Sequence, residues 1–221
     1  MISKPNVGGG VSHPARYSSN LLPVFERHLE GFDRVLDPFA GTGQRLEPLL
    51  ASHDLVGVEL EPEWASVSDW VEQGNALALR FDDATFDAIC TSPTYGNRLA
   101  DHHNAKDPES RRSYTHDLGR TLDQDNSGVL HWGDEYRAFH ERAWLEAIRV
   151  LRPGGRFVLN IKDHIRGGKP QYVSRWHVVM LQGLGLVLVT ISTVETPALR
   201  AGRNATARVA YENVAIFDKP R

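Results

Sequence analysis

The feature that most constrains the fold is a strand-like run that ends in a turn with two glycines. Residues 34–37 are largely apolar and end on an aspartate, and the turn that follows reads Asp37-Pro38-Phe39-Ala40-Gly41-Thr42-Gly43. Residues 44–51 have helical character, so the sequence predicts a strand, a turn and a helix in direct succession. Glycines let a ligand lie against the backbone of such a turn, which the N-terminus of the helix faces. The pattern therefore predicts a ligand site at the end of this strand.

Strands and helices continue to alternate along the chain. The sequence predicts strands at residues 55–60, 86–91 and 156–161, and helices at residues 62–71, 135–151 and 172–183. Such alternation favours a mostly parallel sheet with helical crossovers. Two further strands, at residues 184–194 and 211–218, follow one another without a helix, which indicates an antiparallel hairpin at the sheet edge. We therefore expect an α/β fold formed by a single domain that spans residues 1–221.

The composition indicates a reducing, aqueous setting. No apolar run approaches the roughly 20 residues that a bilayer-spanning helix needs, and the first residues carry no export signal, so we expect a soluble, cytoplasmic protein. The single cysteine, Cys90, excludes an internal disulfide, and its place in an apolar run predicts burial. The 25 Lys and Arg residues against 28 Asp and Glu residues give a net charge of -3, so any nucleic-acid contact must gather its cations locally.

A long polar segment at residues 97–133 has no apolar periodicity, which is typical of a functional or mobile loop. We expect this segment to recognise a target, with help from residues 197–208. The candidates for phosphate contact are Asn97, Arg98, Arg111, Arg112 and Arg203. A metal cluster is the alternative for the histidines of the segment, His102, His103, His116 and His131. Their spacing lacks a helical His pair or a thiol, so loop solvation or phosphate contact is the better interpretation and no metal is expected.

The acid at the end of the second predicted strand, Glu59, narrows the ligand of the glycine turn. A carboxylate at that position can accept two hydrogen bonds from a ribose diol, in sheets that bind nicotinamide dinucleotides and in sheets that bind S-adenosylmethionine. Leu46 stands where the dinucleotide motif needs a third small residue, and Asp37 lies close to where a pyrophosphate needs neutral donors. These two residues count against the dinucleotide.

The turn after the third predicted strand decides between the two cofactors. Ser92-Pro93-Thr94-Tyr95 resembles the motif of amino-methyltransferases, in which Ser, Asn or Asp is followed by two prolines and an aromatic residue. The chain resembles the DNA methyltransferases that act on cytosine N4 or adenine N6, and the likeness covers most of its length. Further matching segments are His13-Pro14-Ala15-Arg16-Tyr17-Ser18, the glycine turn, Glu59, Gly74-Asn75-Ala76, and residues 151–156 and 212–220.

The resemblance implies a Rossmann-like class I methyltransferase fold, S-adenosylmethionine as the cofactor and DNA as the partner, in the setting of restriction–modification. It implies cofactor contacts at His13, Ala15, Tyr17, Asp37, Phe39, Gly41, Gly43, Glu59, Asn75 and Ala76, and catalytic roles for Ser92, Pro93, Thr94 and Tyr95. Thr94 departs from the pattern, because it replaces the second proline and makes the turn less rigid.

The chemistry suits this turn. Acceptors at Ser92 and at the Pro93 carbonyl would orient an exocyclic amino group toward the methyl donor, which is catalysis by positioning and electrostatics. Tyr95 would stack on a base removed from its duplex. Ser92 is the preferred first residue in the cytosine-N4 group that this turn resembles, and the resemblance therefore favours cytosine over adenine. Two alternatives stay open: transfer to an RNA base or a protein amide, and a nucleic-acid-binding protein that has lost turnover.

Overall fold

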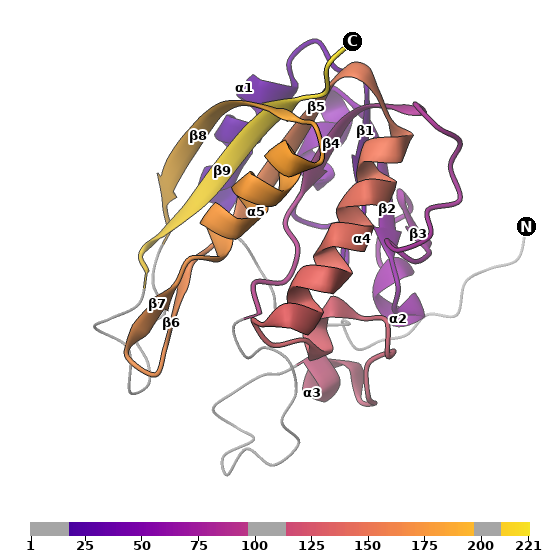
Figure 1. The fold of residues 1–221 in the computed structure, drawn as a ribbon. Coiled ribbons are helices and arrows are strands. Elements are labelled where there is room, and N and C mark those ends of the chain that lie inside the picture. Colours follow the sequence, from indigo (N-terminus) through magenta and orange to yellow (C-terminus); the bar gives the residue numbers. More distant parts are fainter. Residues whose placement is uncertain (1–17, 97–113, 197–208) are drawn as a thin grey trace, which may run out of the picture.

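The computed structural model describes residues 18–96, 114–196 and 209–221. Within these residues the chain forms a seven-stranded sheet with the strand order β3-β2-β1-β4-β5-β9-β8 (Figure 1). The strands of this sheet are β1 (Arg34–Asp37), β2 (Asp54–Glu59), β3 (Val71–Gln73), β4 (Phe86–Thr91), β5 (Leu151–Ile161), β8 (Val187–Glu195) and β9 (Tyr211–Asp218). A separate hairpin is formed by β6 (His164–Arg166) and β7 (Lys169–Gln171).

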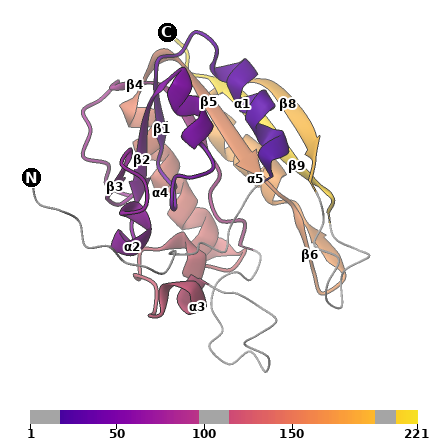
Figure 2. The same cartoon turned by 180° about the vertical axis from the view of Figure 1, so that it is seen from behind.

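Helices cover both faces of the sheet. One face carries α4 (Asp134–Val150) and α5 (Val173–Gly183), as Figure 1 shows, and the opposite face carries α1 (Leu22–Leu29), which is in front in Figure 2. The other described helices are short: α2 (Pro62–Ala65), α3 (Tyr114–Leu118) and the 3-10 turns η1 (Ser19–Leu21), η2 (Glu47–Ala51) and η3 (Ser127–Val129). The layers therefore run helix, sheet, helix.

The sheet is mostly parallel. Strand β1 pairs in parallel with β2 and β4, β2 with β3, and β4 with β5. Strand β9 runs antiparallel to both β5 and β8. The predicted α/β fold with an antiparallel element near one edge is confirmed. The antiparallel strand itself lies between β5 and β8, because β8 reaches the edge first through the crossover helix α5 and β9 then inserts.

Two predicted helices are wrong in extent. Residues 44–51 form only turns and the 3-10 segment η2, in which Leu46 and Leu49 meet the core three residues apart. Residues 62–71 form the single-turn helix α2 and then reach β3, because the backbone of Trp70 accepts a hydrogen bond from Gly57 of β2. The glycine turn therefore lacks the helix N-terminus that the sequence predicted.

Two clusters of apolar side chains, one on each face of the sheet, form the core. In α4 the buried positions recur every three or four residues, as an amphipathic helix requires: Tyr136, His140, Ala143, Trp144, Ala147 and Val150. On the other face Phe25 and Leu29 of α1 pack on Cys90, whose side chain is fully buried. The predicted burial of Cys90 is confirmed, and burial raises the pKa of its thiol.

Parallel strands place the candidate residues at one edge. The carboxyl ends of β1, β2 and β4 bring together Asp37, Glu59 and the segment that begins at Ser92, near the end of the molecule that holds α3 (Figure 1). In the ranges that the structure covers, no helix combines the length and apolar character needed to cross a bilayer.

Candidate active site at the carboxyl edge of the sheet

Glu59 joins the end of β2 to the glycine turn. Its Oε2 accepts a hydrogen bond from the backbone N–H of Gly41 at 3.0 Å, and its Oε1 accepts one from the N–H of Glu61 at 2.9 Å. Asp37, at the end of β1, accepts the N–H of Phe39 at 3.0 Å and the hydroxyl of Thr91 at 2.6 Å. A carboxylate has about four acceptor sites, so both side chains keep capacity for further donors.

Both carboxyl groups are buried at an energetic disadvantage. Burial raises the pKa of Glu59 to about 7, with neighbouring Glu61 adding to the rise, and burial raises the pKa of Asp37 to about 6. Within residues 18–96, 114–196 and 209–221, no cationic side chain contributes to either pKa. A cationic ligand with hydroxyl donors would relieve this disadvantage. S-adenosylmethionine matches this description, because its ribose hydroxyls are hydrogen-bond donors and its sulfonium and ammonium groups are positively charged.

The two glycines of the turn serve different ends. Gly41 has a φ of 55°, which a side chain strains, and its N–H faces Glu59. At Gly43 a Cβ atom would lie 2.7 Å from Val71 and 2.9 Å from Trp70. The sequence predicts ligand contact for both glycines, and at Gly43 the close approach of Trp70 and Val71 and a φ of 75° also require a glycine.

The remaining cofactor candidates differ in position. Asn75 follows β3, where its Nδ2 donates to Asp125 at 3.0 Å and its Oδ1 accepts the N–H of Leu77 at 2.9 Å, and Ala76 beside it is buried. Phe39 turns its ring toward α4, with its centroid 5.7 Å from that of Trp144. The backbone N–H of Phe39 therefore contributes to the turn, whereas its ring packs against α4.

A polar network surrounds the turn after β4. Ser92 Oγ lies 2.8 Å from Tyr95 Oη, and Tyr95 Oη lies 3.1 Å from Glu212 Oε2 on β9. Asn160 of β5 reaches all three with its Nδ2, at 3.1 Å, 3.0 Å and 2.7 Å respectively. Lys162 extends the network, 3.7 Å from Glu212 Oε1 and 2.8 Å from Thr196 Oγ1. Ser92 is half-buried, whereas Asn160 and Glu212 are buried.

Sequence reasoning missed the inner part of this network. Asn160 interrupts the apolar run of β5, and Glu212 stands in register with the buried Val214 and Ile216 of β9. A polar residue at a position that the strand period assigns to the core was the available signal. The network also turns the Tyr95 hydroxyl inward, and burial together with Glu212 raises the pKa of Tyr95.

Thr94 has contacts of its own. Its hydroxyl donates to Ser127, 3.0 Å from Oγ and 3.2 Å from the carbonyl oxygen, and its carbonyl accepts the hydroxyl of Tyr136 at 2.6 Å. Tyr136 Oη in turn lies 3.0 Å from Nε2 of His177, whose Nδ1 accepts the indole N–H of Trp144 at 2.9 Å.

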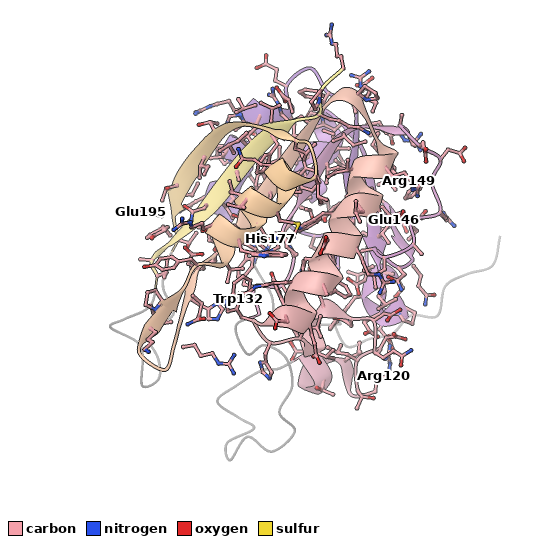
Figure 3. The ribbon with its side chains drawn as sticks, viewed as in Figure 1. Arg120, Trp132, Glu146, Arg149, His177 and Glu195 are labelled. Atoms are coloured by element: carbon pink, nitrogen blue, oxygen red, sulfur yellow. The ribbon has the colours of Figure 1, made fainter. Side chains whose placement is uncertain are left out.

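This chain of bonds fixes the histidine tautomer. An acceptor Nδ1 leaves the proton of neutral His177 on Nε2, which donates to Tyr136. Burial lowers the pKa of His177, so the ring stays neutral. Figure 3 shows His177 between α4 and α5. The helical layer therefore holds the turn by its Thr94 carbonyl.

Part of the predicted loop 97–133 is anchored to the cofactor side of the edge. Arg120 forms ion pairs with Glu61 at 2.7 Å and Glu63 at 2.6 Å, at the end of the molecule that holds α3 (Figure 3). Glu61 Oε1 also accepts the N–H of Asp123 and the side-chain amide of Asn126, both at 2.9 Å. These contacts hold the segment at residues 114–130 beside Glu61, two residues after Glu59.

Several predicted residues lie outside the described residues. These are His13, Ala15 and Tyr17 among the cofactor candidates, Asn97, Arg98, Arg111, Arg112 and Arg203 among the nucleic-acid candidates, and His102 and His103. Among the residues that the structure does place, no three or more His, Cys, Asp or Glu side chains form a group that could hold a metal ion.

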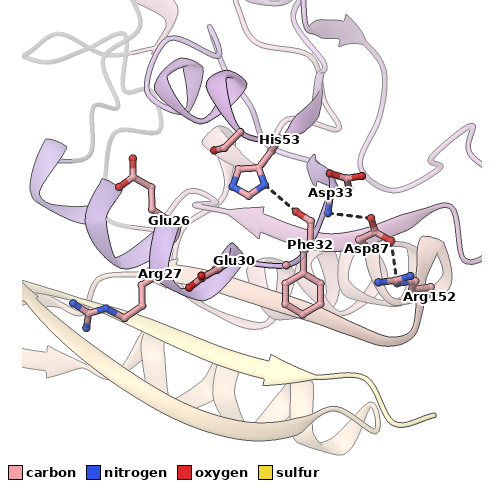
Figure 4. A pocket seen from close by; sticks show the side chains of 10 residues that line it. Glu26, Arg27, Glu30, Phe32, Asp33, His53, Asp87 and Arg152 are labelled. Atoms are coloured by element: carbon pink, nitrogen blue, oxygen red, sulfur yellow. Dashed lines mark hydrogen bonds and ion pairs between the residues drawn. The ribbon is translucent and has the colours of Figure 1, made fainter.

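A cavity at the opposite, amino edge of the sheet has a different character (Figure 4). Its wall includes Asp87, which accepts the N–H groups of Asp33 and Arg34 at 3.1 Å and 2.9 Å and pairs with Arg152 at 2.9 Å. His53 Nδ1 contacts the carbonyl oxygen of Phe32 at 2.8 Å. Asp87 thus binds both the backbone and a cationic side chain.

The fold is similar to those of several solved proteins, whereas no family model and no curated protein sequence matches the chain. The (4+2)-cyclase SpnF matches with a TM-score of 0.58 at 14% identity, over 91% of this chain and 81% of that one. A S-adenosylmethionine-dependent methyltransferase from Methanosarcina mazei matches with 0.56 at 15%, over 90% and 97%. The N-methyltransferase NodS from Bradyrhizobium japonicum WM9, in complex with S-adenosyl-L-homocysteine, matches with 0.53 at 14%, over 90% and 85%.

These likenesses establish a Rossmann-like class I methyltransferase fold. Because the same fold is found in a cyclase, the activity of this chain has to be argued from its site.

Proposed function

We propose that the chain is an S-adenosylmethionine-dependent methyltransferase that modifies an exocyclic amino group of a DNA base, with cytosine N4 favoured over adenine N6. The observation that carries the proposal is the contact between the two halves of the edge. Thr91, which immediately precedes Ser92, donates to Asp37 at 2.6 Å, so the amino-methyltransferase turn adjoins the buried carboxylates. A reacting amino group at Ser92 would lie beside a cofactor held at Asp37, Gly41 and Glu59.

In this proposal Glu59 accepts hydrogen bonds from the ribose, and Asp37 lies near the positive charge of the cofactor. Asn75 and the backbone of Ala76 contact the adenine ring, with His13, Ala15, Tyr17, Phe39 and Gly43 as further contacts. S-adenosylmethionine, when bound, supplies an electrophilic methyl group.

Ser92 Oγ and the Pro93 carbonyl accept the two hydrogens of the target amino group and aim its lone pair at the methyl carbon. The half-buried ring of Tyr95 stacks on the extruded base.

The target-reading element is proposed in residues 97–133 and 197–208 of a single domain, with phosphate contacts from Asn97, Arg98, Arg111, Arg112 and Arg203. So small an element suits a short recognition site or a partner subunit. An RNA base or a protein amide as acceptor, and binding of nucleic acid without turnover, are the competing outcomes of the test.

The test is methyl transfer from tritium-labelled S-adenosylmethionine to unmethylated DNA, total RNA and a protein extract, with Ser92→Ala as the matched control. We expect label in DNA for the wild type alone, recovered by nucleoside mass spectrometry as N4-methylcytosine. Methyladenine alone would change the base and retain the function. Label in RNA or protein would show that the substrate belongs to that class and not to DNA. Binding of DNA without any transfer of label would contradict the proposal that the chain is an enzyme.

A further inference from the structure

The hydroxyl groups of Ser92 and Tyr95 form a row of hydrogen bonds from the half-buried turn to the buried side chain of Glu212. Each hydroxyl has one hydrogen, which determines which group is the donor in each bond. The Tyr95 hydroxyl donates to Glu212 Oε2 at 3.1 Å, and Lys162 Nζ lies 3.7 Å from the other oxygen, Oε1. Tyr95 has only one hydroxyl hydrogen, so Ser92 is the donor in their 2.8 Å contact. Ser92 Oγ accepts from Asn160 and keeps a lone pair for an incoming N–H.

The inference rests on the proposed function, because methylation of an amino group releases a proton. The nitrogen lone pair forms the new bond to the methyl carbon, and the electron pair of the broken carbon–sulfur bond stays on sulfur. The nitrogen then carries a positive charge until one of its hydrogens leaves. In the proposed geometry one N–H donates to Ser92 Oγ, at the outer end of the row of hydroxyls.

We propose that Ser92, Tyr95 and Glu212 form a relay that removes this proton. The nitrogen proton moves to Ser92 Oγ, the Ser92 proton moves to Tyr95 Oη, and the Tyr95 proton moves to Glu212 Oε2. One N–H bond and two O–H bonds break while three O–H bonds form, so both hydroxyls are restored and Glu212 ends protonated. Concerted transfer along short hydrogen bonds avoids a free ionic hydroxyl.

Asn160 positions the relay. Its Nδ2 touches all three members, and its side chain is fully buried with no hydrogen-bond partner for Oδ1 among the described groups. An orphaned buried acceptor costs about 1 to 3 kcal/mol in proteins generally. The opposite amide orientation would place this oxygen against an oxygen of Glu212. The orientation that leaves Oδ1 without a hydrogen bond is therefore the one that lets Nδ2 donate to the network. Lys162, 21% exposed beside Glu212, lies where the proton can pass to solvent between turnovers.

The hydrogen-bond order is tested first without substrate. Carbon-13 NMR of glutamate-labelled protein identifies the Glu212 carboxyl signal as the one lost in Glu212→Gln. We expect Tyr95→Phe, which keeps the ring and removes the hydroxyl, to shift that signal. The control Tyr211→Phe changes the exposed neighbour on β9 and should leave it in place. An unmoved signal in Tyr95→Phe overturns the relay.

Turnover is tested with single-turnover methyl transfer from tritium-labelled S-adenosylmethionine to unmethylated plasmid DNA. We expect Tyr95→Phe and Glu212→Gln each to lower the rate about 100-fold, with cofactor and DNA affinity retained. The double variant should be no slower than either single variant, because both changes interrupt the same relay. Tyr211→Phe and Glu195→Gln, at the exposed end of β8, should match the wild type.

The pH profile separates a proton acceptor from a structural part. We expect the pH dependence of the rate to differ between the wild type and Glu212→Gln, and to be the same in the wild type and Tyr211→Phe. Additive losses in the double variant, or the same pH dependence in Glu212→Gln as in the wild type, overturn the relay while DNA methylation stands. A wild type that methylates no DNA sinks the proposed function and the relay with it, whatever the NMR signal does.

Discussion

The two edges of the sheet treat their carboxylates in opposite ways. At the amino edge, Asp87 binds two backbone N–H groups and the guanidinium of Arg152 (Figure 4). At the carboxyl edge, Asp37 and Glu59 are buried and have no cationic partner among the described residues, and burial raises their pKa to about 6 and about 7. The contacts of Asp87 stabilise the fold, whereas the burial of Asp37 and Glu59 opposes it.

This difference teaches where to look for a ligand. A buried carboxylate without a cation lowers stability, and proteins retain such groups where they meet a substrate or cofactor. At the cavity of the amino edge, Asp87 has a cationic partner as well as backbone donors and lacks this sign. Substitutions at the carboxyl edge should therefore change binding and transfer with little loss of stability, and substitutions at the amino edge should do the reverse.

The largest expected effect is that of Ser92→Ala on methyl transfer. Loss of an oriented acceptor at the reacting centre should lower the rate about 100- to 1000-fold. Affinity for S-adenosylmethionine, measured by calorimetry, should be unchanged, because in the proposed function Ser92 contacts the base and not the cofactor. Equal losses of rate and cofactor affinity would show that Ser92 also contributes to cofactor binding. That result would contradict the assignment of separate roles to the Ser92 turn and to the buried carboxylates.

Glu59→Ala should have the next largest effect, on cofactor affinity. Loss of charge-assisted hydrogen bonds to the ribose should weaken binding by about 2 to 3 kcal/mol. Thermal unfolding of the free protein should show a smaller change, because removal of a poorly solvated carboxyl group offsets the loss of its hydrogen bonds from the N–H groups of Gly41 and Glu61. Unchanged affinity in a folded variant would place the ribose elsewhere.

The pH dependence of stability follows from the raised pKa of Glu59. Its folded pKa of about 7 exceeds the usual glutamate value of 4.5, so between these two pH values the folded state holds a proton that the unfolded state gives up. The contribution is complete below about pH 4.5 and is lost as pH rises through 7, on the order of 3 kcal/mol. Glu59→Gln should flatten this fall in the free energy of unfolding, measured by urea denaturation. An equally steep fall in the variant would show that Glu59 is already ionised in the folded protein.

At the amino edge, Asp87→Ala should lower stability by about 1 to 3 kcal/mol, because the N–H groups of Asp33 and Arg34 lose their acceptor. Cofactor affinity and methyl transfer should match the wild type once the variant is folded. Weakened cofactor binding in Asp87→Ala would erase the distinction between the two edges.

The sequence predicted the residues at strand ends better than the contacts between strands. Asp37, Glu59 and Ser92 each follow an apolar run, so the parallel arrangement alone brings them to one edge. Asn160 meets Ser92 because β5 pairs with β4, and Glu212 meets Tyr95 because β9 inserts beside β5. Both pairings join residues far apart in the sequence. Local patterns carry no direct signal of such a contact.

The local errors have physical causes as well. Helical character at residues 44–51 did not become a helix, because Leu46 and Leu49 reach the core from a 3-10 turn. The polar residues at 114–130 predicted a functional or mobile loop. In the structure, Arg120 and Asn126 bind this segment to Glu61. The side chains that order it are charged, and hydrophobic periodicity does not detect them.

The smallest expected effect concerns Thr94, which tests whether every polar contact at the carboxyl edge is functional. Its hydroxyl is satisfied by Ser127, as the groups of the amino edge are satisfied by their neighbours. Thr94→Val keeps the shape and removes this bond, so we expect a loss of about 0.5 to 1.5 kcal/mol in stability and a small decrease in methyl transfer. Thr94→Pro introduces the second proline of the amino-methyltransferase motif that this turn resembles but also removes the hydroxyl, so its transfer rate should be no higher than that of Thr94→Val. A Thr94→Pro rate above the wild type would show that rigidity of the turn outweighs the bond to Ser127, and a complete loss in Thr94→Val would assign the hydroxyl to the substrate.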